Sequence, residues 1–173
     1  MAVNDIIFYD NGAFGYPGDN VFAVQAQSTL TPAFNPGEIA IRALGASAYV
    51  TSIAASTSTK PVVGTDYIAG ITSGSSTETA SVNGTVTVTK FTTTSTYLMN
   101  PDVAATWDTQ AEYDALVGSR VLVKTSAASN GVVTYTVLAS DSANNGLVVM
   151  PLDVTKYPGK VRVAFRAGLN FLA

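Results

Sequence analysis

The sequence of 173 residues contains neither cysteine nor histidine. Without cysteine, the chain forms no disulfide and offers no thiolate to a metal ion. Without histidine, it has no Ser-His or Cys-His nucleophilic pair, no imidazole acid or base near neutral pH, and no ordinary zinc site. Only carboxylates, lysine, tyrosine and hydroxyls remain for chemistry. We therefore assign no catalytic, cofactor-binding or metal-binding residue, and we expect a protein that is not an enzyme.

Charged side chains are scarce as well. They make up 12% of the chain, whereas about 25% is usual. Because net charge keeps soluble proteins apart, so low a charge suits a chain whose surface is largely covered by other molecules. The 47% hydrophobic content favours a folded core over disorder. No apolar run approaches the roughly 18 residues of a membrane helix, and the first residues lack a signal-peptide pattern, so we expect no membrane partner.

The few charges are distributed unevenly. Residues 1–119 hold three basic and ten acidic side chains, whereas residues 120–173 hold six basic and two acidic ones. Three of these cations are Lys160, Arg162 and Arg166. The two arginines belong to a last predicted strand in which Val161, Val163 and Phe165 alternate with Arg162, Ala164 and Arg166, and Lys160 directly precedes it. They form either a strand face exposed to solvent or a weakly basic surface that binds an acidic partner. Nucleic acid is not an expected partner, because six scattered cations do not form a continuous track for phosphates.

Glycine and proline interrupt residues 1–37, where a long helix cannot form. Aromatic side chains lie between these breaks, and they need a surface on which to be buried. Two interpretations remain open: a loop-rich strand edge folded onto its own domain, or an extended arm that docks on a neighbouring subunit. We predict a division into an N-terminal arm (1–37) and a single β-rich domain (38–173). In the second interpretation the partner-binding aromatics are Phe8, Tyr9, Phe14 and Tyr16.

Strict alternation in residues 84–90 predicts a half-buried strand. Val86 and Val88 point one way, and the threonines between and beside them point the other. A second β-rich run, residues 92–99, follows and ends at an Asn-Pro step. Shorter strands are predicted near residues 39–42 and 49–53. The small residues of 62–71 predict a strand that another backbone approaches closely.

One short helix is predicted at about residues 108–117. Thr109 and Glu112 form a capping box, Tyr113 and Leu116 share a face, and Gly118 ends the helix. So short a helix cannot bury itself, so we expect it to plug one end of a barrel or to lie across a sheet edge. Trp107, directly before the cap, is interpreted as a core anchor rather than as a sugar-binding platform.

Three further strands, residues 120–124, 132–139 and 147–152, are separated by loops that end in Asn-Gly, a strong hairpin signal. Together with the last strand, residues 161–166, they predict a β-meander. The fold class is therefore all-β: a small β-barrel or sandwich with one short helix and an extended N-terminal arm.

Two stretches carry a family resemblance. DYIAGITSGSSTETASVNGTVTVTKFTTTSTYLMNP resembles the core of head decoration (cement) proteins of tailed bacteriophages, and DTQAEYDALVGSRVLVK with GLVVMPLDVTKYPGKVRVAFR is similar to accessory proteins of phage heads. The resemblance implies a protein made in the host cytoplasm that binds the outer surface of the virion capsid. It also implies a homotrimer with the major capsid protein as its partner. The alternatives are a carbohydrate-binding or adhesin-like β-domain of a fibre or surface structure, and a subunit of another phage structure such as a tail tube.

Overall fold

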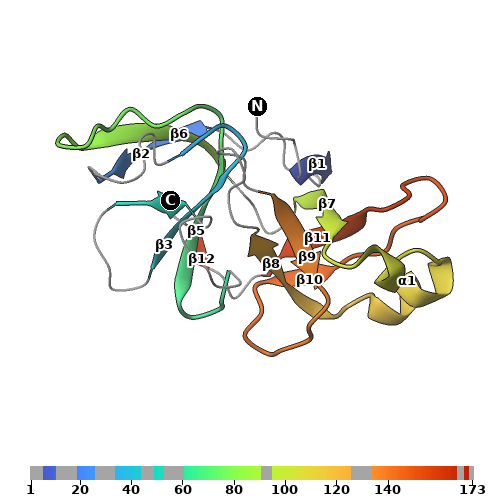
Figure 1. Cartoon of the computed structure of the whole chain (residues 1–173). Coiled ribbons are helices and arrows are strands. Elements are labelled where there is room, and N and C mark those ends of the chain that lie inside the picture. Colours follow the sequence, from blue (N-terminus) through green and yellow to red (C-terminus); the bar gives the residue numbers. More distant parts are fainter. Residues whose placement is uncertain are drawn as a thin grey trace.

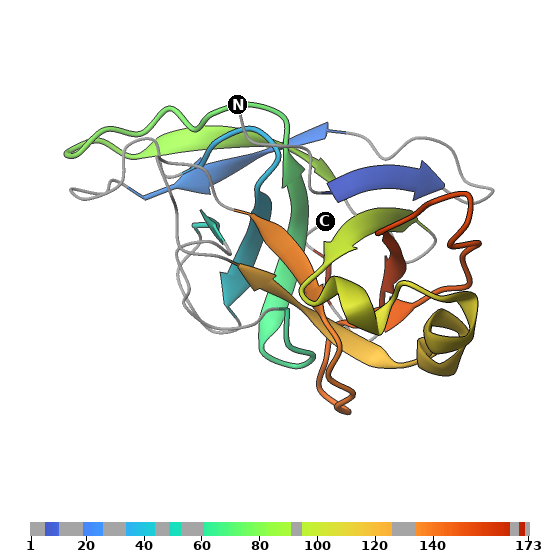
Figure 2. The ribbon, with the colours of Figure 1, turned by 45° about the vertical axis from the view of Figure 1, so that its right-hand side comes forward.

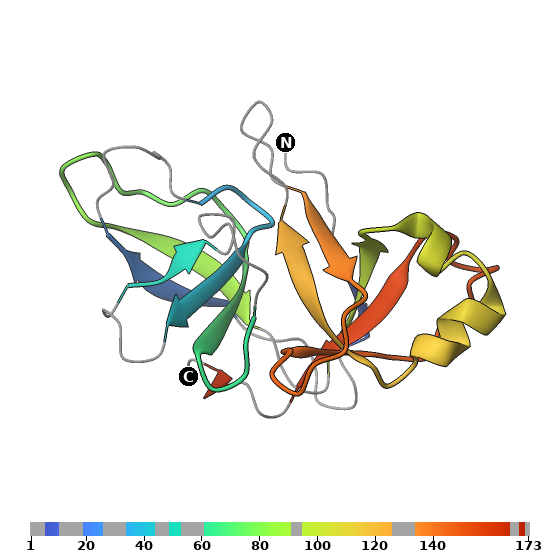
Figure 3. The ribbon, with the colours of Figure 1, turned by 60° about the horizontal axis from the view of Figure 1, so that its bottom comes forward.

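The computed structural model describes most of the chain, namely residues 6–10, 19–25, 34–43, 49–52, 61–90, 95–125, 134–166 and 170–171. Within these residues the regular structure is mainly β-strand, with a single α-helix, α1 (Gln110–Leu116), and one turn of 3₁₀ helix at Ala104–Thr106. The strands form two sheets that lie side by side (Figure 3). The predicted all-β class with one short helix is therefore confirmed.

One sheet closes into a five-stranded barrel (Figure 1). Its strand order is β7-β11-β10-β8-β9, and a parallel pairing of β9 with the last two residues of β7 closes the ring. Closure matters because it leaves the barrel strands without open edges. The bounds are β7 (Thr96–Pro101), β8 (Arg120–Thr125), β9 (Tyr135–Leu138), β10 (Leu147–Val149) and β11 (Val161–Phe165). Outside the ring, β1 (Ile6–Asp10) pairs antiparallel with β7.

The second sheet has the order β2-β6-β5-β3-β4, and β12 pairs in parallel with β5. The bounds are β2 (Asp19–Val24), β3 (Ile39–Ala43), β4 (Thr51–Ser52), β5 (Asp66–Thr72), β6 (Gly84–Lys90) and β12 (Asn170–Phe171). Consecutive strands β6 and β7 thus belong to different sheets, and the chain passes from the second sheet to the barrel between them.

Strand β5, which pairs with β3 on one side and β6 on the other, contains a bulge. Ile68 pairs with Ile41, and Ile71 pairs with Ile39, so β5 contains one extra residue between these pairs. Gly70 lies in the bulge with φ +147°, and a Cβ at this position would lie 2.0 Å from the carbonyl oxygen of Thr89. Glycine is therefore required for β6 to approach β5, which confirms the close backbone contact predicted for residues 62–71.

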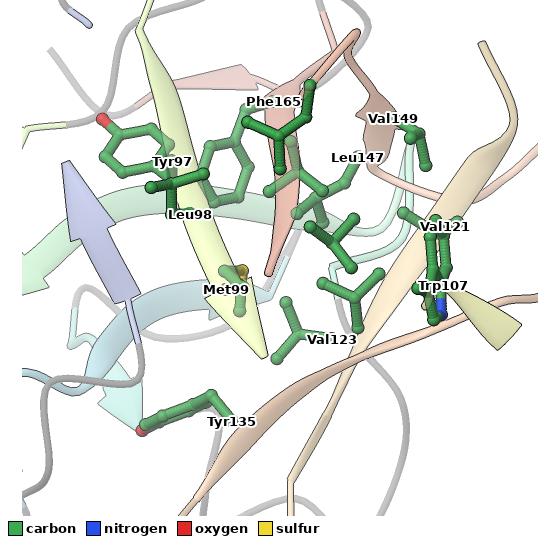
Figure 4. Packing of buried hydrophobic residues seen from close by; sticks show 14 of the residues in the cluster. Tyr97, Leu98, Met99, Trp107, Val121, Val123, Tyr135, Leu147, Val149 and Phe165 are labelled. Carbon is green, nitrogen blue, oxygen red and sulfur yellow. The ribbon is translucent and has the colours of Figure 1, made fainter. Parts of the chain in front are cut away.

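The main core joins the two sheets. Barrel side chains such as Tyr97, Met99 and Phe165 lie together in a buried cluster (Figure 4). Ile39 and Ile68 from the second sheet belong to the same cluster. A smaller cluster lies on the other face of the second sheet. It contains Val24, Phe34, Ala40, Val50, Ala69, Val86 and Val88. The burial of Val86 and Val88 confirms the alternation predicted for β6.

Helix α1 lies at one end of the barrel, as Figure 2 shows. Its predicted capping box is confirmed, because Thr109 accepts from the backbone nitrogen of Glu112 while the Glu112 carboxylate accepts from the backbone nitrogen of Thr109. Tyr113 is completely buried and packs edge-on against Trp107, with 5.7 Å between the ring centroids. Trp107 is only 1% exposed and belongs to the main core, which confirms its interpretation as a core anchor.

The predicted β-meander is wrong in its strand order. In a meander β9 would pair with β10, whereas β8 lies between them and pairs with both. The Asn145-Gly146 step is not a hairpin turn, since Gly146 is not among the glycines with positive φ. Instead, Asn145 is buried, and its amide donates to the carbonyl oxygens of Arg120 and Ser140. These bonds hold the loop before β10 against the start of β8. Strand β10 then pairs with the edge of β8 that β9 does not occupy.

Candidate functional site

The N-terminal aromatics fall in two places. Phe8 and Tyr9 belong to β1, where the backbone of Phe8 pairs with that of Tyr97. Phe14 and Tyr16 lie outside the described residues. Both described strands of the 1–37 segment pair with strands of the same chain, β1 with β7 and β2 with β6. These two stretches match the alternative of an edge folded onto its own domain, and a role for the four aromatics in partner binding stays a prediction.

The three predicted C-terminal cations lie in one row, at alternating positions along β11 and its flanks. Each is half-buried and donates hydrogen bonds to its own chain. Lys160 donates from Nζ to Oδ1 of Asn100 at 2.7 Å. Arg162 donates to Thr96 Oγ1 and the Pro151 carbonyl oxygen, and Arg166 donates to the carbonyl oxygens of Ala143 and Asn145. The row therefore ties β11 to the segments around it, and whether it also binds a partner stays a prediction.

Among the side chains that the structure describes, the exposed charged ones lie in one part of the molecule. The exposed charged side chains belong to the barrel, α1 and their connections: Asp108, Glu112, Asp114, Lys124, Asp141, Asp153 and Lys156. Between residues 21 and 89, by contrast, the carboxylates whose side chains are described, Glu38, Asp66 and Glu78, are 5%, 2% and 3% exposed. Arg42 in the same range is half-buried and lies 5.4 Å from the centre of the Tyr67 ring. Among residues 21–89, the side chains that the structure describes thus add almost no exposed charge to the second sheet.

One face of β2 and β6 carries exposed valine and threonine side chains. Val21 pairs with Thr87 and Ala23 pairs with Thr85, so these four side chains share a face, while the residues between them turn to the smaller core. Val21 is 66% exposed, and Thr85 and Ala23 are also exposed. The Oγ1 of Thr77 lies 3.4 Å from that of Thr85 and adds a third row. We call Val21, Ala23, Thr77, Thr85 and Thr87 the threonine face.

The sequence predicted the threonine half of this face and missed the β2 half. Residues 20–24 are Asn-Val-Phe-Ala-Val, which do not alternate between polar and apolar side chains. This stretch is short and follows a run of glycines and prolines, so the whole segment was interpreted as an arm or loop.

Buried polar groups hold the far edge of the second sheet together. The Oε2 of Glu38 accepts from Ser52 Oγ at 2.7 Å, and its Oε1 accepts from Asn35 Nδ2 at 3.4 Å. The backbone nitrogen of Glu38 donates to Thr72 Oγ1 at 2.9 Å. Burial raises the pKa of Glu38, although the bonds from Ser52 and Asn35 oppose the shift. The carboxyl group thus links β3 to β4 and has no contact that indicates a catalytic role.

A shallow groove of about 490 Å³ lies between α1 and the turn that follows β10. Its lining residues are Gln110, Asp114, Pro151, Leu152, Asp153, Lys156 and Tyr157. The amide of Gln110 accepts from the backbone nitrogen of Val154 and donates to the Leu152 carbonyl and to Asp114. The Asp153 carboxylate accepts from Thr155, which holds its pKa below the usual range. The groove walls are therefore fixed by bonds within the chain.

The comparisons with known proteins add no relative. The sequence matches no protein-family model, no curated protein and no solved structure. Among the described residues, no three or more acidic side chains gather where they could hold a metal ion. None of the helices in that part of the chain has the length and apolar character needed to cross a membrane.

Proposed function

We propose that this chain is a non-enzymatic structural protein that binds the outer surface of a phage capsid and stabilises it as a decoration protein. The observation that carries the proposal is that none of the charged side chains described between residues 21 and 89 is exposed, combined with exposed valine at position 21. A free monomer gains solubility from charge, so a surface with few exposed charges suits a protein that spends its working life attached to another surface.

The family resemblance supports the same proposal. The stretch that carries it, residues 66–101, forms β5, β6 and β7 and therefore spans both sheets. Its side chains enter the main core at Ile68 and Met99 and the smaller core at Val86. A decoration protein needs a rigid body that covers a junction between capsid subunits. Because the shell repeats the site many times, a modest affinity at each one is enough to strengthen the whole.

Binding to capsids tests the proposal directly. The purified chain is mixed with empty, expanded capsids built from the major capsid protein of the phage that encodes it, and the capsids are pelleted through a sucrose cushion. Saturable co-sedimentation is the expected result, with the protein accessible to antibody on the outside of the particle. Failure to co-sediment at micromolar concentration contradicts the proposal. Sedimentation velocity of the free protein tests the expected homotrimer, and a monomer mass at all concentrations contradicts it.

The groove beside α1 favours one second candidate, a carbohydrate-binding β-domain. Its lining includes two carboxylates, Asp114 and Asp153, and an aromatic ring, Tyr157, which are the groups that usually contact sugar hydroxyls and sugar faces. A glycan array probed with the purified chain separates the two functions. Selective glycan binding that is lost in Asp114→Ala favours the carbohydrate-binding candidate.

A further inference from the structure

Two short strands share one edge of β7. Strand β11 occupies the other edge, and β9 pairs with β7 only at Asn100 and Pro101, where it closes the barrel. Strand β1 covers the stretch before that closure, residues 96–99, in antiparallel register. The structure therefore shows what this part of the edge accepts: an extended segment with the sequence IIFYD.

No short turn ties β1 to the β7 of its own chain. The paired residues, such as Ile6 and Met99, lie far apart in the sequence. The strand that follows β1 is β2, which belongs to the second sheet. The sequence between β1 and β2, residues 11–18, includes three glycines and a proline, and a linker of this length spans at most about 30 Å. The β7 edge of an adjoining copy within that distance is thus open to β1.

The barrel is complete without β1. The pairing of β7 with β11 and its closure with β9 involve no residue of β1. Tyr97 and Met99 of β7 belong to the main core, together with side chains from the other barrel strands. Within the described residues, β1 pairs with β7 and with no other strand. It can therefore leave one barrel and enter another while both barrels stay closed.

Neither β1 nor the edge that it covers is stable alone. Four of the five residues of β1 are isoleucine, phenylalanine or tyrosine, and a bare β7 edge would expose unpaired backbone groups. Each copy of the chain carries the same strand and the same edge, so the β1 of a neighbour satisfies the edge as well as its own does. Copies held side by side raise the effective concentration of the neighbouring strand.

The C-terminal strand β12 covers a gap in a similar way. It pairs in parallel with Tyr67 and Ile68 of β5, at residues that β6 does not reach. With only two residues, however, β12 forms few of the backbone bonds that would hold two copies together. The five residues of β1 make it the stronger candidate for a contact between copies.

We infer that β1 is exchanged between copies of this chain, so that the β1 of one copy pairs with residues 96–99 of the next in the register seen within one chain. The strand and the edge are different surfaces, so each copy donates to one neighbour and accepts from another, and such contacts close only as a ring. The predicted homotrimer is a ring of this kind. The two interpretations of residues 1–37 then describe the same strand pairing, made within one copy or between two. The inference concerns the free protein and does not rest on capsid binding.

Introduced cysteines test the exchange cleanly, because the chain has none of its own. Ile7→Cys combined with Leu98→Cys places two thiols at paired positions of β1 and β7. Val21→Cys combined with Thr87→Cys does the same for β2 and β6 and is the matched control. After mild oxidation, electrophoresis without reductant and intact mass measure linked chains, and circular dichroism shows that each variant is folded.

The exchange predicts different products for the two pairs. A disulfide between β1 and β7 of different copies joins the chains, so most of the Ile7→Cys/Leu98→Cys protein should run as linked multimers. The Val21→Cys/Thr87→Cys control should run as a monomer with an internal disulfide. The single variants Ile7→Cys and Leu98→Cys, mixed in urea and refolded together, should give a linked dimer that contains one chain of each.

Three outcomes overturn the inference. The Ile7→Cys/Leu98→Cys pair forms its disulfide but stays a monomer, the control pair links copies to the same extent, or the wild-type chain sediments as a monomer at all concentrations. If Ile7→Cys/Leu98→Cys does not fold, Asp10→Cys with Thr96→Cys at the other end of β1 decides by the same criteria. Linked multimers without co-sedimentation on capsids would uphold the exchange and contradict the proposed function, so the two fail separately.

Discussion

The hydroxyl of Tyr113 donates to the carbonyl oxygen of Met150 at 2.9 Å. The same hydroxyl accepts from the backbone nitrogen of Arg162, also at 2.9 Å. One phenol on α1 thus joins the end of β10 to the start of β11, in a position where its own ring is completely buried. Helix α1 is held to the barrel by this contact as well as by its apolar face.

Removing that hydroxyl should destabilise the fold. Tyr113→Phe leaves the partly buried Met150 carbonyl and the Arg162 backbone N–H without this partner, and we expect a loss of about 1–2 kcal/mol in the free energy of unfolding. Urea denaturation measures the loss. Tyr49→Phe is the control, because the Tyr49 hydroxyl bonds to Asn83 at an exposed site and its removal should cost less than about 0.5 kcal/mol. Equal losses in the two variants would contradict the anchoring role.

Tyr113 should also make the stability of the fold depend on pH in the alkaline range. Burial raises the pKa of Tyr113 from 10.0 to about 12, while the backbone bond and the charge of Arg162 oppose the shift. The folded state keeps the phenol neutral to a higher pH than the unfolded chain does, so this contribution is complete below pH 10 and is lost as the pH approaches 12. The stability difference between wild type and Tyr113→Phe, measured from pH 9 to 12, should shrink. A constant difference would contradict the shift.

The buried carboxyl group of Glu38 should likewise make the stability of the fold fall as the pH rises, here in the acidic range. Its carboxyl group has an ordinary pKa of 4.5, which burial raises in the folded state. The folded chain therefore holds this proton to higher pH, and the associated stability is present below pH 4.5 and lost as the pH rises through the raised pKa. Glu38→Gln cannot ionise, so wild type should lose stability relative to this variant between pH 4 and pH 7. Denaturation at several pH values measures the trend, and the opposite slope would show that the bonds from Ser52 and Asn35 dominate.

Two glycines provide a test of how residues 73–78, a strip that runs beside β6, pack against that strand. A Cβ at Gly84 would lie 2.1 Å from the backbone nitrogen of Glu78, so Gly84→Ala must push residues 77–78 away from β6. We expect a loss of about 2 kcal/mol or more in the free energy of unfolding. Gly74 in the same strip has no atom within 4 Å of such a Cβ, so Gly74→Ala should be neutral or slightly stabilising. Similar effects of the two substitutions would mean that the strip does not pack as described.

The aromatics of the N-terminal segment give a further test of partner binding. If Phe14 and Tyr16 clasp a neighbouring subunit, Phe14→Ala and Tyr16→Ala should lower capsid occupancy without lowering the free energy of unfolding of the free chain. Co-sedimentation and urea denaturation on the same samples measure both quantities. Loss of stability with unchanged occupancy would show that these side chains pack on their own domain.

Local signals in the sequence predicted local structure well. Thr109 and Glu112 fix the start of α1 within one turn, and the alternation around Val86 identifies β6 with its correct buried side. Both depend on residues close together in the chain, where spacing alone decides which side chains meet.

Long-range pairing was harder to predict. The position of β10 beside β8 depends on Asn145, whose amide reaches Arg120, and no local pattern indicates that contact. Strand β2 has no alternating pattern and follows a run of glycines and prolines, so its pairing with β6 was not predicted. For the same reason the sequence indicated only the β6 half of the threonine face. The sequence shows that Thr85 and Thr87 share a side, and the fold is needed to place Val21 next to them.

The melting temperature of the capsid tests the central claim most directly. Expanded capsids are heated with and without a saturating amount of the purified chain, and shell disruption is followed by calorimetry. Because a ligand that binds only the intact shell stabilises it, wild type should raise the transition temperature. An unchanged transition in the presence of wild type would contradict the account.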